Sequence, residues 1–186
     1  MKKSTLTLSL IAVLLTVGCS EQNEDKAAAG PVAASAPAAP AVKNAVVSKD
    51  VPAEIKDAAF ENIAGACSLD VVNNALVGEA TEVTVNRADG LMVDGWAFDE
   101  KNAAVPATVV LQLAHGEERY FALLNRHGGR DDLAKAYAKP EFANAAYGAP
   151  LDIAALPAGQ YEVSVIQKAE GKSLVCATKR KLNLQG

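Results

Sequence analysis

Apolar and polar residues alternate with a period of two through most of the chain beyond Cys67. Val109, Leu111 and Leu113, for example, share one parity, and turn-forming residues separate their run from the next one. The runs with this pattern are 81–86, 91–98, 106–113, 119–124, 160–168 and 173–184. Short, regularly spaced runs of this kind are typical of antiparallel sandwiches and barrels. The pattern therefore predicts a mainly β domain.

Two stretches have helical spacing instead. Apolar residues recur at every fourth position from Val51 to Ile63, while Asp50 can cap the start and Gly65 is a stop signal. In the second stretch, 130–137, apolar residues stand three and four positions apart. We therefore expect an N-terminal helix that packs on the strands and one short helix that crosses an edge of the sandwich.

The first residues have the organisation of a signal sequence. Lys2 and Lys3 precede the uncharged, 12-residue run Leu6–Val17, which is too short to cross a hydrocarbon layer of about 30 Å. The run is followed by Gly18 and Cys19. This segment predicts export, either as a lipoprotein or through an ordinary secretory signal cut nearby.

The tripeptide Val-Gly-Cys that ends at Cys19 resembles the lipobox of bacterial lipoproteins, although Thr16 stands where that family usually has leucine. The resemblance implies a signal peptide over 1–18 and a lipid-modified Cys19, whose acyl chains anchor the protein in a membrane. Ser20 in place of aspartate resembles the sorting signal for the outer membrane. The expected location is therefore the bacterial cell envelope, with an anchor in the outer membrane.

The segment 19–49 is rich in alanine and proline. Pro31, Pro37 and Pro40 are incompatible with a continuous helix, and small side chains bury too little surface to offset the cost of ordering the chain. We therefore expect a disordered tether over 19–49 and a sandwich domain with its N-terminal helix over 50–186. A proline-spaced tether of about 30 residues reaches several tens of Å.

Two cysteines, Cys67 and Cys176, remain once Cys19 is set aside for the lipid. An even number of cysteines in an exported protein favours a disulfide. Cys176 shares the parity of Leu182 and Leu184, so its side chain is expected to face the core. We predict a Cys67–Cys176 disulfide that joins the two ends of the domain. A metal-binding pair or a redox couple is disfavoured because the two cysteines do not have Cys-x-x-Cys spacing.

Composition and charge narrow the possible functions. The 186 residues, of which 22% are charged and 5% aromatic, leave room for one ordinary domain and short extras. The formal net charge is -4, so the chain has no cationic excess with which to neutralise a phosphate backbone. Nucleic acid is therefore not an expected partner.

Motifs that carry known chemistry are missing. The sequence has no Gly-x-Ser-x-Gly elbow, no glycine-rich phosphate loop and no calcium-binding loop. His115 and His127 both stand beside glycine in expected loops, and a zinc site would need acidic ligands from other turns. Asp94, Asp99 and Glu100 form no strong paired-carboxylate motif. We therefore expect no catalytic residues, no metal and no cofactor in a protein that is not an enzyme.

Four segments stand in the order found in an Ig-like module of bacterial envelope proteins. They are Gly-Leu-Met-Val-Asp-Gly-Trp-Ala-Phe-Asp at 90–99, a proline-led strand at 106–113, Asn-Arg-His-Gly-Gly-Arg-Asp-Asp-Leu-Ala at 125–134 and Leu-Pro-Ala-Gly-Gln-Tyr at 156–161. The resemblance covers 81–184 and implies an Ig-like antiparallel β-sandwich with one or two short helices. It implies no activity, since such a module is attached to proteins of different roles.

The 125–134 segment interrupts the strand pattern and concentrates charge, so it is the first place to expect a ligand site. Its candidate binding residues are Arg126, His127, Arg130 and Asp131. The alternative roles, a loop-fixing ion pair and a helix cap, apply to Arg126, Arg130, Asp131 and Asp132. Trp96, the sole tryptophan, is a candidate platform for a sugar ring, and its alternative role is to fill the core.

These features together predict a lipid-anchored, non-catalytic envelope lipoprotein that binds or scaffolds another envelope component, either a protein or a glycan. The tether favours this function because reach is useful to a binder. One alternative is an immunity or exclusion lipoprotein that blocks a toxin, a lysozyme-like hydrolase or phage entry, since an acidic mature domain suits a basic hydrolase. The second alternative is an envelope enzyme, which the missing motifs disfavour.

Overall fold

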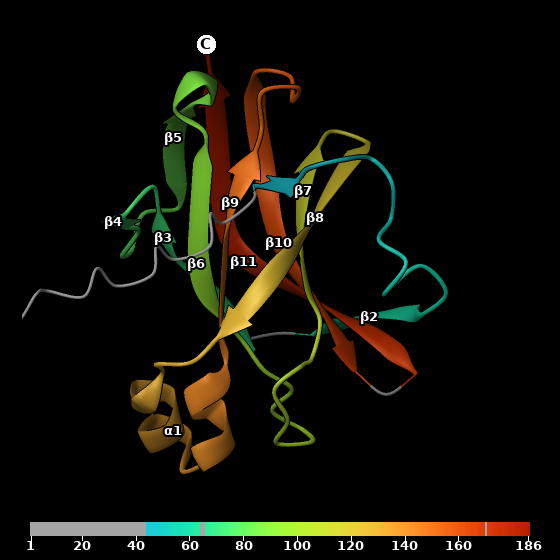
Figure 1. Ribbon diagram of the computed structural model, residues 1–186, viewed down its shortest axis with the longest axis vertical. Coiled ribbons are helices and arrows are strands. Elements are labelled where there is room, and N and C mark those ends of the chain that lie inside the picture. Colours follow the sequence, from blue (N-terminus) through green and yellow to red (C-terminus); the bar gives the residue numbers. More distant parts are fainter. Residues whose placement is uncertain (1–43, 64–65, 170) are drawn as a thin grey trace, which may run out of the picture. The chain divides into compact units, whose positions relative to one another are not determined.

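Strands make up most of the folded chain, as the alternating pattern predicts (Figure 1). The computed structural model describes residues 44–63, 66–169 and 171–186, all of which belong to one compact unit. The predictions for the signal sequence, for Cys19 and for the tether up to residue 43 lie outside the described residues.

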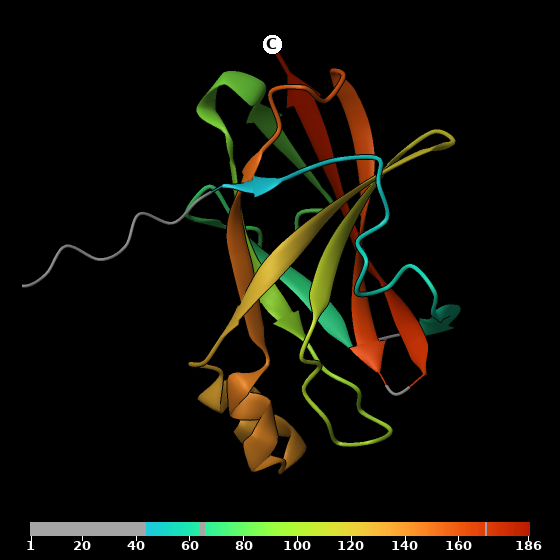
Figure 2. The ribbon, with the colours of Figure 1, turned by 45° about the vertical axis from the view of Figure 1, so that its right-hand side comes forward.

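The main strands form one hydrogen-bonded path. Their bounds are β2 (Ala59–Ile63), β3 (Cys67–Val72), β4 (Ala75–Leu76), β6 (Leu91–Ala97), β7 (Val109–His115), β8 (Glu118–His127), β9 (Ala146–Asp152), β10 (Gly159–Ala169) and β11 (Lys172–Gln185). The path runs β2-β11-β10-β7-β8-β9-β6-β3-β4. Residues 118–124 of β8 pair with β7, whereas residues 125–127 pair with β9. The path therefore folds at β8 (Figure 2) into sheet A, with β4, β3, β6 and β9, and sheet B, with β7, β10, β11 and β2.

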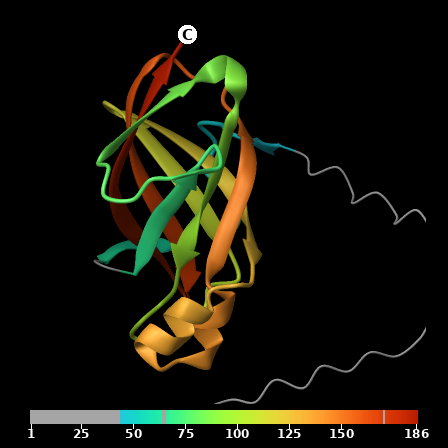
Figure 3. The same ribbon diagram turned by 90° about the vertical axis from the view of Figure 1, so that its left-hand side faces the viewer.

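The two sheets pack face to face. Seen from the side, β6 and β9 lie in one layer and β10 and β11 in the other (Figure 3). Each strand contributes alternate side chains to a shared core. Buried members of this core are Leu69, Val93 and Tyr147 from sheet A and Leu111, Val163 and Leu182 from sheet B. The predicted mainly β sandwich is confirmed.

The edges of the sandwich depart from the purely antiparallel arrangement that we expected. Two short strands, β2 and β5 (Glu82–Asn86), pair in parallel with the same edge of β11, at residues 172–176 and 181–185. The same edge of the long β11 thus pairs with β2 first and with β5 further along the chain. Between these two pairings, the guanidinium of Arg180 donates hydrogen bonds to the carbonyl oxygens of Gly78 and Ala80.

The domain begins before residue 50, so the predicted boundary between tether and domain is too late. The strand β1 (Ala45–Val46) pairs in parallel with β9. Ser48 and Phe121 then exchange backbone hydrogen bonds with N···O distances of 3.0 and 2.7 Å. Edge pairing, with Ala45 and Val47 packed against the core, therefore orders a segment that its composition assigns to the tether.

The predicted N-terminal helix over 51–63 is wrong. Residues before Ala59 form turns, in which backbone N–H groups such as that of Ile55 bond three residues back, and 59–63 is strand β2. Of the four-residue repeat, Ile55 alone is fully buried, against the outer face of sheet B, and Val51 is exposed. Pairing with the edge of β11 outweighs the local helical spacing.

The second predicted helix is confirmed. Helix α1 (Asp131–Tyr137) and the 3-10 helix η2 (Pro140–Asn144) lie between β8 and β9, and a shorter 3-10 helix, η1 (Arg87–Asp89), precedes β6. Phe98 stacks on Phe142 with 4.0 Å between ring centroids, and together with Leu133 they form a small second core. Among the described residues, no helix has both the length and the apolar character needed to cross a bilayer.

The predicted disulfide is confirmed. Cys67 at the start of β3 is bonded to Cys176 of β11, with 6.1 Å between their Cα atoms. The bridge therefore joins sheet A to sheet B, and Cys176 is buried as its parity predicts.

The Leu-Pro-x-Gly-x-Tyr turn fixes the entry to β10. The Tyr161 hydroxyl donates to the carbonyl oxygen of Pro157, four residues upstream, at 2.8 Å. The Arg87 guanidinium donates to the neighbouring carbonyl of Leu156, also at 2.8 Å. A buried tyrosine bonded to the backbone a few residues before it is a recurring device of Greek-key sandwiches.

Candidate functional site

A charged pair lies on the outer face of sheet A. Asp94 points away from the core because its neighbours on β6, Val93 and Gly95, face inward. Asp94 stands opposite Gly148 of β9, which in turn stands opposite Asn125 of β8. The Asp94 carboxylate extends across β9 to His127, with 2.8 Å between Oδ2 and Nε2.

Gly148 makes this reach possible. A Cβ atom at this position would lie 2.7 Å from Asp94 Oδ2 and 2.9 Å from the carbonyl oxygen of Val93. Both distances are too short for a carbon atom, so any larger residue would displace the carboxylate that pairs with His127. The lack of a side chain at Gly148 therefore allows the Asp94 carboxylate to reach His127.

An arginine clamp lies beside this pair. Arg130 donates from Nη1 to Asp70 Oδ2 at 2.7 Å, and from Nε and Nη2 to the two oxygens of Asp132 at 2.9 and 2.8 Å. The Ser68 hydroxyl donates to the other oxygen of Asp70 at 2.6 Å. The Arg130 side chain is only 19% exposed, so a guanidinium on the surface is held in one orientation by two carboxylates.

The clamp changes the acidity of its members. The hydrogen bonds from Arg130 lower the pKa of Asp132 from 3.8 to about 2. The same bonds, those to Asp132 first and those to Asp70 after them, raise the pKa of Arg130. The Asp132 carboxylate is therefore ionised at neutral pH, and its pair with Arg130 is fully charged.

Tyr147 lies in the core on the opposite face of sheet A from the two pairs and is bonded to the backbone of β3. Its ring is fully buried, and its hydroxyl donates to the carbonyl oxygen of Ser68 at 2.7 Å. Burial is the main cause of its raised pKa, and the charges of Asp70 and Asp94 raise it further. The charges of both carboxylates thus act on the same buried tyrosine. We call the surface formed by Ser68, Asp70, Asp94, His127, Arg130 and Asp132 the sheet A patch.

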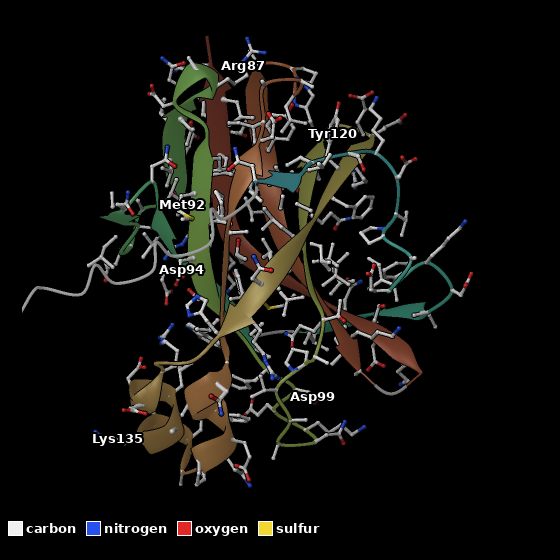
Figure 4. The ribbon with its side chains drawn as sticks, viewed as in Figure 1. Arg87, Met92, Asp94, Asp99, Tyr120 and Lys135 are labelled. Carbon is white, nitrogen blue, oxygen red and sulfur yellow. A yellow bond between two sulfur atoms is a disulfide. The ribbon has the colours of Figure 1, made fainter. Side chains whose placement is uncertain are left out.

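The structure brings two of the five candidate binding residues into this patch, His127 and Arg130. Trp96 is half-buried and stacks on Phe98 with 5.0 Å between ring centroids, which is the core-filling alternative. Arg126 is exposed on β8, and Asp131 is exposed in the first turn of α1. Figure 4 shows Asp94 on β6, with Lys135 of α1 below it.

The loop-fixing role expected of the charged residues is confirmed in part. Arg130 forms the ion pair with Asp132. The N-cap of α1, however, is Arg130 itself, and its side chain makes no capping hydrogen bond. Asp70 was missed by sequence reasoning because it lies at a register shift between Leu69 and Val71 of β3, and no alternating run marks that strand.

The hydroxyl of the sheet A patch, that of Ser68, is bonded to a carboxylate. The Ser68 hydroxyl donates to Asp70 and not to His127, so the hydrogen bond between nucleophile and base of a serine hydrolase is not formed. His115 lies elsewhere, stacked on Tyr161 with Nδ1 3.0 Å from the carbonyl oxygen of Gln160. Within the described part of the chain, no three His, Cys, Asp or Glu residues converge as metal ligands would.

In comparisons with known proteins, no protein-family model, curated protein or solved structure matches this chain. The lipobox and the Ig-like envelope module therefore stay predictions from the sequence.

We expect Arg130→Met to raise the pKa of Asp132 from about 2 toward 3.8. A folded-state pKa below the unfolded value stabilises the protein above that unfolded value, and the stabilisation is lost as the pH falls through about 2. The free energy of unfolding of the variant should therefore fall less than that of the wild type when the pH is lowered from above 3.8 to about 2. Carboxyl-detected NMR titration measures the pKa directly. Arg126→Met is the matched control and should leave the pKa of Asp132 unchanged.

We expect Gly148→Ala to destabilise the domain by about 1–3 kcal/mol, the usual cost of overpacking. Urea unfolding of the wild type, the two single variants and the double variant with Asp94→Ala measures the coupling between the positions. Removal of the carboxylate should recover part of the cost, while the contact with the Val93 carbonyl keeps the rest. An equal cost in both backgrounds would show that Asp94 does not lie over Gly148.

Proposed function

We propose that this chain is a lipid-anchored, non-catalytic lipoprotein of the bacterial cell envelope, and that its sandwich domain binds another envelope component through the sheet A patch. Cys19 carries the lipid, the outer membrane holds the anchor, and the alanine- and proline-rich segment gives the domain its reach. The lipobox tripeptide and the tether composition support the anchored location.

The observation that carries the binding role is the fixed Arg130 clamp. Its guanidinium is held by Asp70 and Asp132 and is largely covered, yet it lies beside the more exposed Asp94–His127 pair. A charged surface that is already ordered loses little conformational freedom when a partner binds. Arranged charges of both signs give orientation and specificity to such a contact.

Covalent cross-linking in the native cells, followed by affinity purification and mass spectrometry, tests this function. The wild type should capture one dominant partner, either a protein or a glycan fragment. Cys19→Ala should lose the partner because the anchor is gone, and the double variant Asp94→Ala with His127→Ala should lose it because the patch is changed. The matched control is Lys49→Ala with Glu118→Ala, which removes an exposed ion pair elsewhere on the domain and should keep the partner.

Two results would overturn this proposal. The first is a partner that is retained in full by the Asp94 and His127 double variant. The second is a catalytic turnover of the purified protein that is lost with His127→Ala. Capture of a basic hydrolase together with its inhibition would identify the bound component as a foreign enzyme and support the exclusion function.

A further inference from the structure

A groove lies at the end of the sandwich near Asp99, at the opposite end from Arg87 (Figure 4). One wall is the loop 99–107, and the other is formed by residues of β2, β10 and β11. Two adjoining hollows of about 660 and 530 Å³ make up this groove, and they share Asp99, Asn102, Ala169 and Leu174. We call it the end groove. Each of the two hollows has a volume in the range of sites that hold small ligands.

Gln167 supplies an unused hydrogen-bond acceptor in the end groove. Its side chain faces inward from β10 and is 0% exposed, and it is part of the groove lining. The amide Nε2 donates to the carbonyl oxygen of Ala66 at 3.1 Å. The amide oxygen Oε1 has no partner among the described residues. A buried acceptor left without a donor is unfavourable, so a bound group with an N–H or O–H would be stabilised there.

Asp99 serves a different purpose in the same place. It is 7% exposed, and its two oxygens accept hydrogen bonds from the backbone N–H and the side-chain amide of Asn102, at 3.2 and 2.7 Å. Asp99 therefore holds the loop that forms one wall. Among the described lining residues, the Gln167 amide oxygen is the buried acceptor without a hydrogen-bond partner.

The rest of the lining is aliphatic, with charges of both signs. Ile63, Val105, Pro106 and Leu174 supply apolar surface, and Lys172 pairs with Glu61. No aromatic residue stands among the lining residues on which a sugar ring could stack. A peptide matches this combination, because each residue brings a backbone N–H next to an aliphatic or charged side chain.

We propose that the end groove binds a short peptide segment, with one amide N–H donating to Gln167 Oε1 and a small aliphatic side chain against Leu174. This site is separate from the sheet A patch. Its existence does not depend on the lipid anchor or on the partner proposed above.

Ligand-observed NMR on the full-length protein in detergent micelles tests this site with two probes. N-acetylalanine methylamide has two amide N–H groups, whereas N-acetyl-N-methylalanine dimethylamide has none. The wild type should bind the methylamide about tenfold more tightly, the effect of one hydrogen bond to a buried acceptor. Gln167→Met should bind the two probes equally. Asp94→Ala, in the sheet A patch, should leave both affinities unchanged.

A second variant guards against misfolding of Gln167→Met. Ala107 is exposed and lies in the loop wall, so Ala107→Trp should fill the groove and abolish binding of both probes. Equal binding of the two probes by the wild type, or no binding of either, would overturn the proposal. Unchanged binding by Ala107→Trp would also overturn it, because the probes would then bind elsewhere.

Discussion

Loss of the Cys67–Cys176 disulfide is expected to lower the free energy of unfolding by about 2–5 kcal/mol, the usual effect in small exported domains. The bonded cysteines are 109 residues apart, so the bridge closes most of the domain into one loop. The chain-entropy model gives about 4.7 kcal/mol for a loop of about 100 residues. A loss of this size is a large fraction of the about 5–15 kcal/mol that stabilises a typical domain.

Guanidinium chloride unfolding measures this effect when all proteins carry Cys19→Ala, so that reductant acts on one bridge only. Reductant should shift the midpoint of the parent protein to that of the variant with Cys67→Ala and Cys176→Ala. The same reductant should leave the double variant unchanged. Coincident curves for the oxidised and reduced parent would contradict a stabilising role for the bridge.

The disulfide and the long strands were predictable because each depends on parity along one strand. Val163 and Val165 of β10 alternate with polar residues, and both are buried in the shared core. Cys176 follows the same rule on β11. A period of two survives folding because successive side chains of a strand must point to opposite faces.

Strand β9 was not predicted because its residues do not alternate between apolar and polar and are determined by contacts with neighbouring strands. Gly148 and Pro150 interrupt its sequence, and both residue types normally weaken a strand. Gly148 lies under Asp94, and Pro150 lies beyond the stretch of β9 that pairs with β8, 146–148. The presence of glycine and proline in this strand is thus explained by contacts and strand pairings in the folded protein, which the sequence alone does not show.

The sheet A patch was half predictable for the same reason. His127 and Arg130 lie in a charged interruption of the strand pattern, a signal that a single sequence shows. Their partners Asp70 and Asp94 lie on β3 and β6, and the contacts depend on the register of β3, β6, β9 and β8. A register is a property of pairs of strands, so composition and spacing do not reveal it.

We expect Gly95→Ala to destabilise the domain by about 3 kcal/mol or more, at the upper end of overpacking effects. A Cβ atom on Gly95 would lie 2.1 Å from the backbone carbonyl oxygen of Ser68 and 2.7 Å from the hydroxyl oxygen of Tyr147. The first atom belongs to the paired strand β3 and cannot rotate away. The melting temperature should therefore fall by roughly 10 °C in a domain of this size.

Gly128→Ala is the matched control, because a Cβ there would meet only Asn144 Oδ1, at 3.4 Å. Its stability should stay within about 0.5 kcal/mol of the wild type. Adding Tyr147→Phe to Gly95→Ala should not restore stability, since the backbone contact with Ser68 remains when the hydroxyl is gone. Equal melting temperatures for Gly95→Ala and Gly128→Ala would contradict this prediction. They would show that Leu69 and Gly95 are not paired as the β3–β6 register places them.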